Sequence, residues 1–356
     1  MPRSAITPPT IDPTPIFEHF RGAHGTELLT AAVAHLHLFD HLAAQGPMRI
    51  EALQSAMGLA ERPTVVLVTA LRAMGLLRQN EEGRIALGDL AEEHLVRGGE
   101  FDISGYIGLA AQSPNVLAMV ERLRSNQPAG MGKDEAGAAY IFRSGIESAM
   151  EQETTARSLT LALAGRAKNV APVMAQVAAL DKARVLLDVG GGTGIYAIAC
   201  LQAYPALRAI VWDRPEVLKV AEEFAQSHGV ADRLELVSGD MFADSVPPGV
   251  DAVLLSNILH DWDIPECKIL VRRLADALPD GGNIMIHDVY LNDAMDGPLS
   301  IALYSASLFT LTEGRAYSAQ EYREMLVDAG LEPGEVVPTL VHCGVLTGTK
   351  RGNVRR

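Results

Sequence analysis

The sequence lacks long apolar runs, and it contains only three cysteines in 356 residues. No run reaches the roughly 18 apolar residues that a membrane-spanning helix needs, so we expect no membrane partner. The first residues also lack the charged and then apolar pattern of a secretion signal, which favours a cytoplasmic protein. Cys200, Cys267 and Cys343 are widely spaced and form no metal-ligand pattern. We therefore interpret them as small buried side chains and expect no metal site.

Positive charge is also scarce. The chain has 30 lysine and arginine residues against 44 aspartate and glutamate residues, which gives a net charge of −14. The resulting negative field repels a phosphate backbone, so nucleic acid is not an expected partner. With 48% hydrophobic residues, the composition is typical of a globular protein with two domains. Residues 1–15 and 350–356 have no apolar periodicity, and we expect a flexible arm and a basic tail there.

The first hundred residues follow the pattern of a winged helix. The spacing of apolar residues predicts helices over 50–57 and 63–77. A short hairpin is expected over 78–87, with Gly83 at its turn. The second helix carries Arg72 as its only cation, which is a poor composition for reading DNA.

The same region carries more apolar side chains than a small domain can bury by itself. They recur at helical spacing over residues 27–44 and along the second predicted helix. The positions are Ala32, Val33, Leu36, Val65, Val66, Leu67, Leu71 and Met74. Because an apolar helix face must be covered, we expect a second copy of the chain to cover it in a homodimer.

The remaining chain predicts an α/β fold. From residue 184 onward, short β-rich runs alternate with amphipathic helices, which is typical of a doubly wound, Rossmann-like parallel sheet. Ser318 and Glu321 form a capping-box pattern before a helix over 322–329. The expected strands are 184–189, 207–212, 234–237, 251–256 and 283–289, with a closing pair at 336–340 and 341–347.

Three domains follow from these patterns. Residues 101–165 are mostly helical in pattern, with a break at 127–135, and are expected to form a linker and one wall of a pocket. The expected domains are a mostly helical winged-helix dimerisation domain over 1–100, this helical linker over 101–165, and a Rossmann-like domain over 166–350.

A glycine loop follows the first strand of the predicted sheet. The strand Leu186-Leu187-Asp188-Val189 runs into Gly190-Gly191-Gly192-Thr193-Gly194, and a helix is expected from about Ile195. Glycines allow a tight turn there and let the backbone approach a ligand closely. By itself, such a loop also fits a tight turn in any α/β protein or a dinucleotide enzyme.

Acidic residues follow the next two predicted strands. Asp213, with Arg214 after it, stands where this fold places a carboxylate for the two ribose hydroxyls. Asp240 stands at the end of the third strand, in place to meet an adenine amino group, with Met241 and Phe242 as apolar cover. Together with the glycine loop, these residues indicate a ligand that contains a nucleoside.

A histidine follows the fourth predicted strand, in Ser256-Asn257-Ile258-Leu259-His260-Asp261-Trp262. Because an open α/β sheet keeps its ligand at the carboxyl ends of its strands, His260 is a candidate general base. The alternative is a polar cluster that starts a helix, with His260 only hydrogen-bonded. The loops expected at the same edge favour the catalytic interpretation.

These motifs resemble the plant-caffeate-type small-molecule O-methyltransferases and their bacterial relatives in natural-product biosynthesis. The resemblance rests on Leu187 to Gly194, Asp213-Arg214-Pro215, Gly239-Asp240-Met241-Phe242, Leu259-His260-Asp261-Trp262 and Ala277-Leu278-Pro279-Asp280-Gly281-Gly282. It covers nearly the whole chain, because those enzymes also begin with a winged-helix dimerisation domain. It implies S-adenosylmethionine (SAM) as cofactor and a small-molecule acceptor as substrate.

The resemblance also implies a role for individual residues. Gly190 and Gly192 would face the methionine part of the cofactor, Asp213 its ribose, Asp240 and Met241 its adenine, and His260 would be the general base. The complete set of expected cofactor contacts is Asp188, Gly190, Gly192, Asp213, Arg214, Asp240, Met241, Phe242 and Ser256.

Two features depart from the family pattern. Those enzymes usually flank the histidine with two glutamates, whereas this chain has Asp288, 28 residues after His260, and Ala316 at the other position. A lysine often found four residues before the histidine is Ser256 here. We expect Asp288 to hold the tautomer of His260 without a second carboxylate, with Glu313 as the one fallback.

The acceptor pocket is expected to combine apolar walls with one polar contact. Asn257, which shortly precedes His260, is predicted to hydrogen-bond the substrate. The predicted walls are Tyr106, Phe142, Met150, Met295 and Phe309. For each apolar member, a place in the ordinary core is an equal alternative.

The expected reaction is O-methylation of a hydroxyl on a small aromatic or polyketide-like intermediate. One alternative is a C- or N-methyltransferase of the same architecture, whose acceptor needs no strong base, and Ala316 favours it. A winged-helix regulator that senses a small molecule would need a basic face, which the composition lacks. A cofactor-binding scaffold without turnover is a further alternative.

Overall fold

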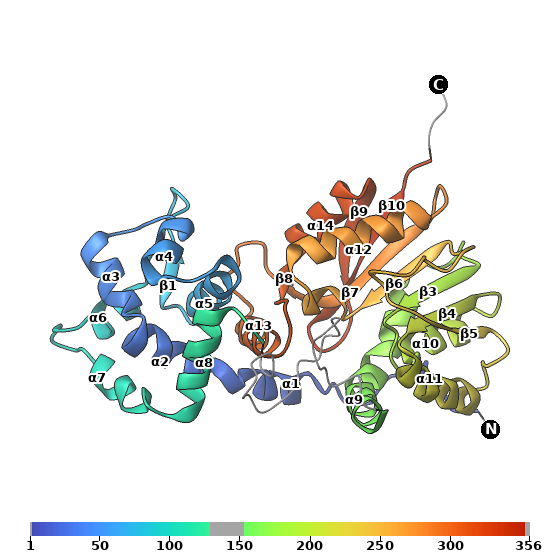
Figure 1. Ribbon diagram of the computed structural model, residues 1–356, viewed down its shortest axis with the longest axis horizontal. Helices are drawn as coiled ribbons and strands as arrows, with labels where there is room; N and C mark the ends of the chain where they lie inside the picture. Colours follow the sequence, from blue (N-terminus) through green and yellow to red (C-terminus); the bar gives the residue numbers. More distant parts are fainter. Residues whose placement is uncertain (1, 129–152, 353–356) are drawn as a thin grey trace. The chain divides into compact units, whose positions relative to one another are not determined.

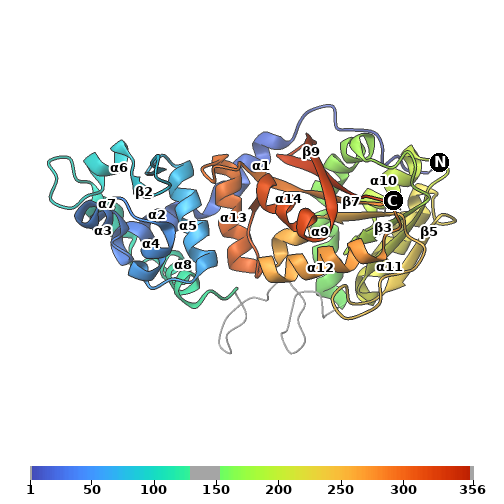
Figure 2. The same ribbon diagram turned by 90° about the horizontal axis from the view of Figure 1, so that it is seen from above.

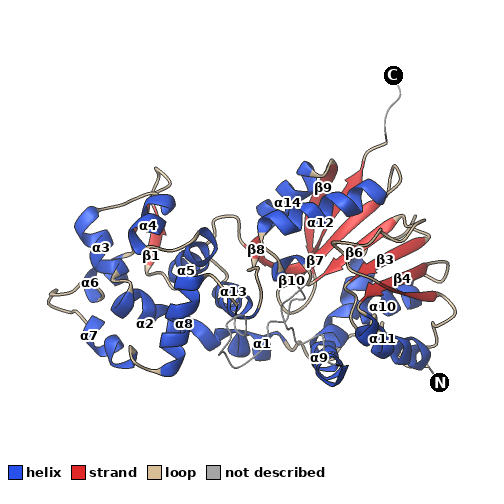
Figure 3. Ribbon diagram, in the orientation of Figure 1, coloured by secondary structure: helices blue, strands red, loops and turns tan. Residues whose placement is uncertain are grey.

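The computed structural model describes residues 2–128 and 153–352. The chain forms two compact units that are interleaved along the sequence. The sheet unit consists of Met1–Pro15, Tyr140–Tyr290 and Tyr317–Arg356, and the helical unit consists of Ile16–Ala139 and Leu291–Ala316. Figure 1 colours the chain along the sequence, and Figure 3 shows that most strands belong to the sheet unit.

A mixed sheet in the order β5-β4-β3-β6-β7-β10-β9 forms the centre of the sheet unit. Its parallel strands are β3 (Val185–Val189), β4 (Arg208–Asp213), β5 (Leu234–Ser238), β6 (Ala252–Ser256) and β7 (Asn283–Leu291). The antiparallel strands are β9 (Leu331–Pro338) and β10 (Cys343–Lys350), and the short β8 (Tyr317–Ser318) pairs with β7. The strand order reverses between β3 and β6, and such sheets bind ligands at this switch point, beyond the carboxyl ends of the strands.

Helices cover both faces of this sheet (Figure 1). On one face α9 (Glu153–Val177), α10 (Ile195–Ala203) and α11 (Pro215–His228) pack together. On the other face α12 (Ile264–Ala277) packs with α14 (Ala319–Asp328). Since both faces are covered, the central strands β3 and β6 bury nearly all of their side chains.

The predicted α/β fold is confirmed, and each of the five parallel strands ends within two residues of its predicted range. The helix start at Ile195 and the capping box of Ser318 with Glu321 are also confirmed. The predicted closing pair is present, but its bounds differ, because β9 starts at Leu331 and residues 339–342 form a turn before β10. Pro333 and Gly334 conceal the first half of β9 in the sequence, and a strand at the edge of a sheet tolerates them.

The N-terminal arm is held against the sheet unit, so the expectation of a flexible arm is wrong. The Arg3 N–H donates to the Ser227 carbonyl at 2.9 Å, and the Ala5 N–H donates to Gln202 Oε1 at 2.7 Å. Further along, Thr14 Oγ1 accepts a hydrogen bond from the backbone N–H of Val341. These bonds satisfy backbone groups that apolar periodicity does not report.

The predicted tail also begins differently from expectation, because Lys350 is the last residue of β10. Its ammonium donates to the carbonyls of Ala275 and Leu278 at 2.8 and 2.7 Å, at the end of α12. Over the ranges described above, no helix is both long and apolar enough to cross a membrane.

The helical unit contains the predicted winged-helix pattern. The helix α4 (Ile50–Met57) has the predicted bounds, whereas α5 (Glu61–Ala73) begins two residues earlier and ends four residues earlier than predicted. β1 (Leu77–Gln79) and β2 (Ile85–Leu87) form the hairpin, with Gly83 in its turn at a φ of +75°. Other helices are α1 (Thr14–Arg21), α2 (Gly25–Thr30), α3 (Leu38–Gln45), α6 (Asp89–His94), α7 (Ser104–Ile107) and α8 (Pro114–Ser125).

The apolar face of α5 is covered within the chain. The helix α13 (Leu299–Leu311), which follows β7 in the sequence, packs against α5 in the helical unit (Figure 2). Ala32, Val33, Val66, Leu67 and Leu71 are all at most 3% exposed in this core. Leu36, Val65 and Met74 stay partly exposed, so most of the predicted surface, but not all of it, is covered without a second copy. The position of α13 also means that the two units do not follow the three contiguous domains expected from the sequence.

Candidate active site

The glycine loop lies at the carboxyl end of β3, in the sheet unit. Gly190 has a φ of +60°, and a Cβ atom at this residue would lie 2.6 Å from Cδ1 of Ile258, which follows β6. Only glycine fits both the backbone conformation and this close approach. The loop therefore passes close to the segment that leads to His260.

Asp188 lies beneath this loop and is fully buried. In the part of the chain that the structure describes, neither of its carboxylate oxygens accepts a hydrogen bond of good geometry. Burial raises the pKa of Asp188 to about 7, in spite of the backbone N–H of Ala197 nearby. A buried carboxylate without a partner is a strained arrangement that a bound donor group would relieve.

Asp213 is tied to the glycine loop at the end of β4. Its Oδ2 accepts a hydrogen bond from the Gly192 N–H at 2.8 Å, and its Oδ1 accepts one from the Arg214 N–H at 2.7 Å. Burial raises the pKa of this carboxyl, whereas both hydrogen bonds lower it. Each oxygen keeps a second lone pair, so the carboxylate can still accept hydrogen bonds from two hydroxyl groups.

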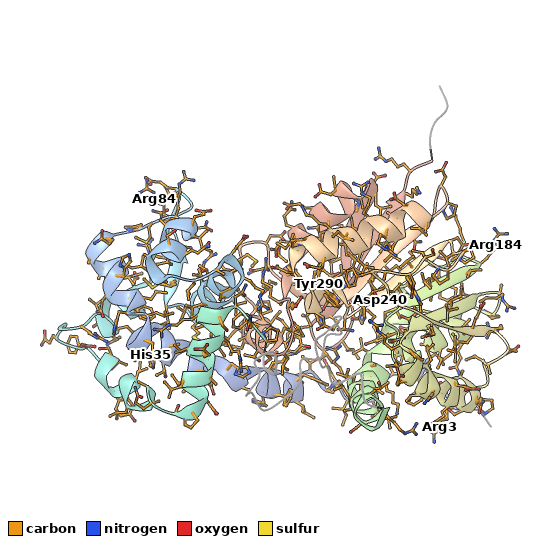
Figure 4. The ribbon with its side chains drawn as sticks, in the orientation of Figure 1. Arg3, His35, Arg84, Arg184, Asp240 and Tyr290 are labelled. Atoms are coloured by element: carbon orange, nitrogen blue, oxygen red, sulfur yellow. The ribbon has the colours of Figure 1, made fainter. Side chains whose placement is uncertain are left out.

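Asp240 follows β5 and is partly occupied by contacts within the protein. Its Oδ2 lies 3.0 Å from Nη2 of Arg214, and its Oδ1 accepts the Phe242 N–H at 2.8 Å. The ring of Phe242 meets the ring of Trp262 edge to face, with centroids 4.6 Å apart. The Asp240 loop is thereby connected to the segment that carries His260 (Figure 4 labels Asp240).

His260 and Asp288 form a buried hydrogen-bonded pair. His260 Nδ1 lies 2.6 Å from Asp288 Oδ1, and both side chains are at most 5% exposed. Because an ionised carboxylate can only accept, Nδ1 carries the proton, and Nε2 keeps its lone pair in the neutral ring. The Asp288 carboxylate thereby fixes the tautomer of His260.

The charges around His260 determine its pKa. Burial lowers the pKa of His260, but the carboxylates of Asp288 and Asp261 together outweigh burial, so the pKa is raised above its ordinary value of 6.5. Asp261 lies beside the other ring nitrogen, with its Oδ1 3.6 Å from Nε2. Arg166 on α9 opposes these carboxylates and lowers the pKa of the imidazole.

A second buried histidine, His287, points to the opposite side of β7 from Asp288. Asn257 Nδ2 donates to Ser256 Oγ at 3.0 Å, and Ser256 Oγ is hydrogen-bonded to His287 Nδ1 at 2.8 Å. On its other side, His287 Nε2 lies 3.3 Å from Thr339 Oγ1. Burial lowers the pKa of His287 to about 3, and the ring is neutral at physiological pH.

This network holds Asn257 in an unusual conformation. Asn257 has a φ of +57°, and its N–H donates to the His287 carbonyl at 2.8 Å. Its side-chain oxygen is buried and, among residues 2–128 and 153–352, has no partner. Sequence reasoning assigned Ser256 to the cofactor, and the structure shows it hydrogen-bonded to His287 and Asn257.

The described residues of the predicted pocket wall differ in their exposure to solvent. Tyr106, Met295 and Phe309 belong to the helical unit. Tyr106 is 78% exposed, whereas Phe309 is fully buried in the core, where the Arg62 guanidinium lies over its ring. Phe309 thus occupies the ordinary core position that the sequence left open. Phe142 and Met150 lie outside the described residues.

Several residues at this site were missed by sequence reasoning. Asp261 belongs to the motif that contains His260, so the sequence shows its charge. The sequence does not show that its carboxylate lies close to Nε2 of His260. His287 and Asp288 are neighbours on β7, so their side chains are expected on opposite faces of the sheet. This expectation does not tell which residues His287 contacts. No signal in the sequence points to Arg166 on α9 or to Tyr322 on α14, which contacts Asp288.

Comparisons with known proteins agree with this geometry. The model of the O-methyltransferase domain matches residues 129–332, and the model of the O-methyltransferase dimerisation domain matches residues 17–97. The chain belongs to the O-methyltransferase family. This membership confirms that the protein is a methyltransferase with SAM as cofactor, as the sequence motifs predicted.

Individual relatives of this methyltransferase extend along nearly the whole chain. The 3-hydroxy-5-methyl-1-naphthoate 3-O-methyltransferase of Streptomyces sahachiroi is 35% identical over 92% of each chain. The acetylserotonin O-methyltransferase of Bos taurus is 32% identical over 88% of this chain and 90% of its own. A crystal structure of an O-methyltransferase family 2 protein from Planctomyces limnophilus in complex with apigenin is 49% identical, with a TM-score of 0.87, and covers 98% of this chain and 99% of that chain.

The residues at the sheet edge fit the cofactor. The glycine loop offers an open backbone surface at Gly192, where a Cβ atom would meet nothing within 4 Å, and Asp188 offers a buried carboxylate beneath the loop. A cationic ammonium group and a pair of ribose hydroxyls are the groups that such carboxylates accept. Across the described segments, no group of three metal-ligating side chains could hold a metal ion.

Proposed function

We propose that this methyltransferase transfers a methyl group to a hydroxyl of a small aromatic acceptor, with His260 as the general base. The observation that carries the proposal is the 2.6 Å hydrogen bond between His260 and Asp288, buried at the same sheet edge as the glycine loop. The naphthoate 3-O-methyltransferase and the complex with apigenin support an aromatic hydroxyl as the acceptor.

SAM supplies an electrophilic methyl group when bound, so the chain has to hold the two reactants in line and remove the acceptor proton. Asp188, Gly190 and Gly192 would hold its methionine part, together with Ser256. Asp213 would accept the ribose hydroxyls. The adenine would lie among Asp240, Met241 and Phe242, with Arg214 keeping the Asp240 carboxylate in place.

His260 would act through its Nε2 atom. A phenol with a pKa of about 10 is mostly protonated at neutral pH, so a base within hydrogen-bond distance makes its oxygen a better nucleophile. The Nε2 lone pair accepts this proton, and the Asp288 carboxylate stabilises the imidazolium that results. Asn257 would orient the acceptor through its side-chain amide.

A C-methyltransferase is the second candidate. An L-tyrosine C(3)-methyltransferase of Streptomyces lavendulae is 28% identical over 88% of this chain, and Ala316 stands where the family pattern has a second glutamate. Both candidates share the cofactor site, and they differ in the atom that receives the methyl group.

The products decide between the two candidates. The protein would be incubated with SAM and a panel of acceptors that contains apigenin, hydroxynaphthoates and L-tyrosine, and the products would be analysed by mass spectrometry and NMR. A methoxy signal on an aromatic ring is expected. A methyl group on a ring carbon would overturn the hydroxyl assignment, and no transfer to any acceptor would count against an aromatic substrate.

We further propose a homodimer formed through the helical unit, in keeping with the dimerisation-domain match. Large apolar side chains are exposed on this unit, namely Phe20 at 76%, Phe101 at 55%, Tyr106 at 78% and Leu109 at 80%. Exposed apolar side chains of this size are typical of protein interfaces. Light scattering should give twice the mass of the chain, and a monomer at micromolar concentration would overturn this proposal.

A further inference from the structure

Tyr322 lies in the first half of α14 and is fully buried beside the proposed catalytic pair. Its ring meets the rings of Tyr290 and Tyr317 edge to face, and both centroid distances are 5.5 Å. These contacts fix the direction of the phenol. Its hydroxyl donates a hydrogen bond to Oδ2 of Asp288 at 3.1 Å.

This hydrogen bond completes the surroundings of Asp288. The other oxygen, Oδ1, accepts hydrogen bonds from His260 Nδ1 at 2.6 Å and from the Val289 N–H at 2.8 Å. Both oxygens are therefore engaged, and the plane of the carboxylate cannot turn without breaking a bond. The pKa of Tyr322 is raised well above its ordinary value by burial and by the charge of Asp288, so the phenol stays protonated and can only donate to the carboxylate.

We propose that Tyr322 is a positioning residue for the His260–Asp288 pair, and that its hydroxyl orients Asp288 at a site that lacks the second glutamate of the family pattern. The inference rests on the proposed role of His260. The chemistry differs from that of a second acid, because a neutral donor orients Asp288 without adding negative charge near the imidazole.

Two consequences follow from this difference. The hydroxyl draws charge from Asp288 and weakens its attraction for the imidazolium, so loss of the hydroxyl should raise the pKa of His260 further. Loss of the hydroxyl also frees the carboxylate to rotate, so a smaller fraction of His260 rings would be aligned for proton removal. The acceptor and cofactor contacts are unaffected, because Tyr322 is not among them.

The test compares Tyr322→Phe with Tyr290→Phe. Both changes remove one phenolic oxygen from the same aromatic cluster, but the Tyr290 hydroxyl donates to the Ile286 carbonyl at 2.7 Å instead of to Asp288 (Figure 4 labels Tyr290). The other charged or titratable groups that act on the pair, Asp261, Arg166 and Cys267, are unchanged in both variants. Tyr290→Phe is therefore a matched control.

The first readout is the pKa of His260, measured by NMR on histidine-labelled protein saturated with S-adenosylhomocysteine (SAH). The signal is assigned by its loss in His260→Asn. Tyr322→Phe should shift this pKa upward, because the Asp288 carboxylate no longer shares its charge with the phenol, whereas Tyr290→Phe should leave it unchanged. An unchanged pKa in Tyr322→Phe would overturn the proposal, as would an equal rise in both variants.

The second readout is kinetic, with the acceptor found in the product assay. Tyr322→Phe should lower kcat about three- to tenfold and move the alkaline rise of the pH–rate profile to higher pH, with KM for both substrates unchanged. A loss of kcat that Tyr290→Phe shares, without a shift of the profile, would indicate a purely structural role.

A further version of the NMR measurement covers the case in which Tyr322→Phe does not fold. Replacing all tyrosines by 3-fluorotyrosine in the wild-type chain keeps every ring and strengthens each phenol as a donor. The pKa of His260 should then fall, and an unchanged value would overturn the proposal. The NMR readout needs no turnover, so it separates this inference from the proposed function. If His260→Ala keeps its activity, His260 is not the base, but the effect of Tyr322 on the pKa of the imidazole can still be measured.

Discussion

The edge of the sheet where the strands end has two halves that use carboxylates differently. In one half, Asp213 and Asp240 accept hydrogen bonds from backbone N–H groups, which fix the loops after β4 and β5. In the other half, Asp288 accepts its shortest hydrogen bond from a side chain that itself titrates, His260. A carboxylate held by backbone amides keeps its place for a ligand, whereas one paired with imidazole sets the basicity of that ring. Changes in the first half should alter cofactor affinity, and changes in the second half should alter turnover and its pH dependence.

Replacement of His260 should give the largest effect. His260→Ala should lower kcat by about 10²–10⁴, the usual contribution of a general base. Its affinity for SAH, measured by calorimetry, should stay at the wild-type value, because the change lies outside the half that binds the cofactor. Near-full activity with an acceptor known to be a hydroxyl would show that alignment alone drives the transfer.

Replacement of Asp288 should rank second. Asp288→Asn should lower kcat by about 10²–10³, because the amide can donate to Nδ1 and stabilise the wrong tautomer. The charge of Asp288 raises the pKa of His260 against burial, so its removal should let burial dominate and lower that pKa. The rising limb of the pH–rate profile should accordingly start above pH 6.5 in the wild type and move to lower pH in the variant. If the limb does not move, it reports the titration of a group other than His260.

Replacement of Asp213 should affect affinity alone. Asp213→Ala should weaken SAH binding by about 1.5–3 kcal/mol, the range for losing hydrogen bonds to a charged group. At saturating SAM, kcat should be close to that of the wild type. Asp232→Ala, at an exposed position on the same unit, is the control. Unchanged affinity in calorimetry would contradict the ribose assignment and the division of the edge into two halves.

The smallest effect is expected at Asp188, which lies under the glycine loop. Its pKa is raised to about 7 by burial, so the folded state holds the proton more tightly than the unfolded chain does. The stabilising contribution of the neutral acid is therefore complete below the unfolded pKa of about 3.9 and is lost as the pH rises through about 7. The melting temperature of Asp188→Asn should rise by a few degrees relative to the wild type between pH 5 and pH 8, in the absence of SAH. A difference that is constant with pH would show that Asp188 is ionised throughout.

Local signals in the sequence were sufficient for most of this edge. The strand before the glycine loop, the start of α10 and the capping box of Ser318 depend on residues that are close neighbours in the chain, and the structure has them within two residues of the predicted positions. The position of Asp288 at 28 residues after His260 also followed from a motif. Such features are readable because backbone conformation and burial periodicity are set over short distances.

Features that depend on distant segments were missed or misjudged. The N-terminal arm has no apolar period, yet backbone hydrogen bonds to Ser227 and Gln202 hold it in place. The apolar face of α5 was correctly recognised, but its cover is α13, a helix more than 200 residues further along the chain. Periodicity reports that a face is buried and does not report what buries it.

The sequence by itself determined the fold class, the cofactor and the residues at each strand end of this methyltransferase, since each of these is encoded in a contiguous segment. Only the tertiary structure decided what holds Asp288, the partner of the candidate base, in place. Tyr322 and Asp288 are 34 residues apart in the chain, and they belong to a helix and a strand, respectively. They meet because α14 packs on the face of the sheet to which Asp288 points, and a packing direction of this kind is fixed by the whole core instead of by any local pattern.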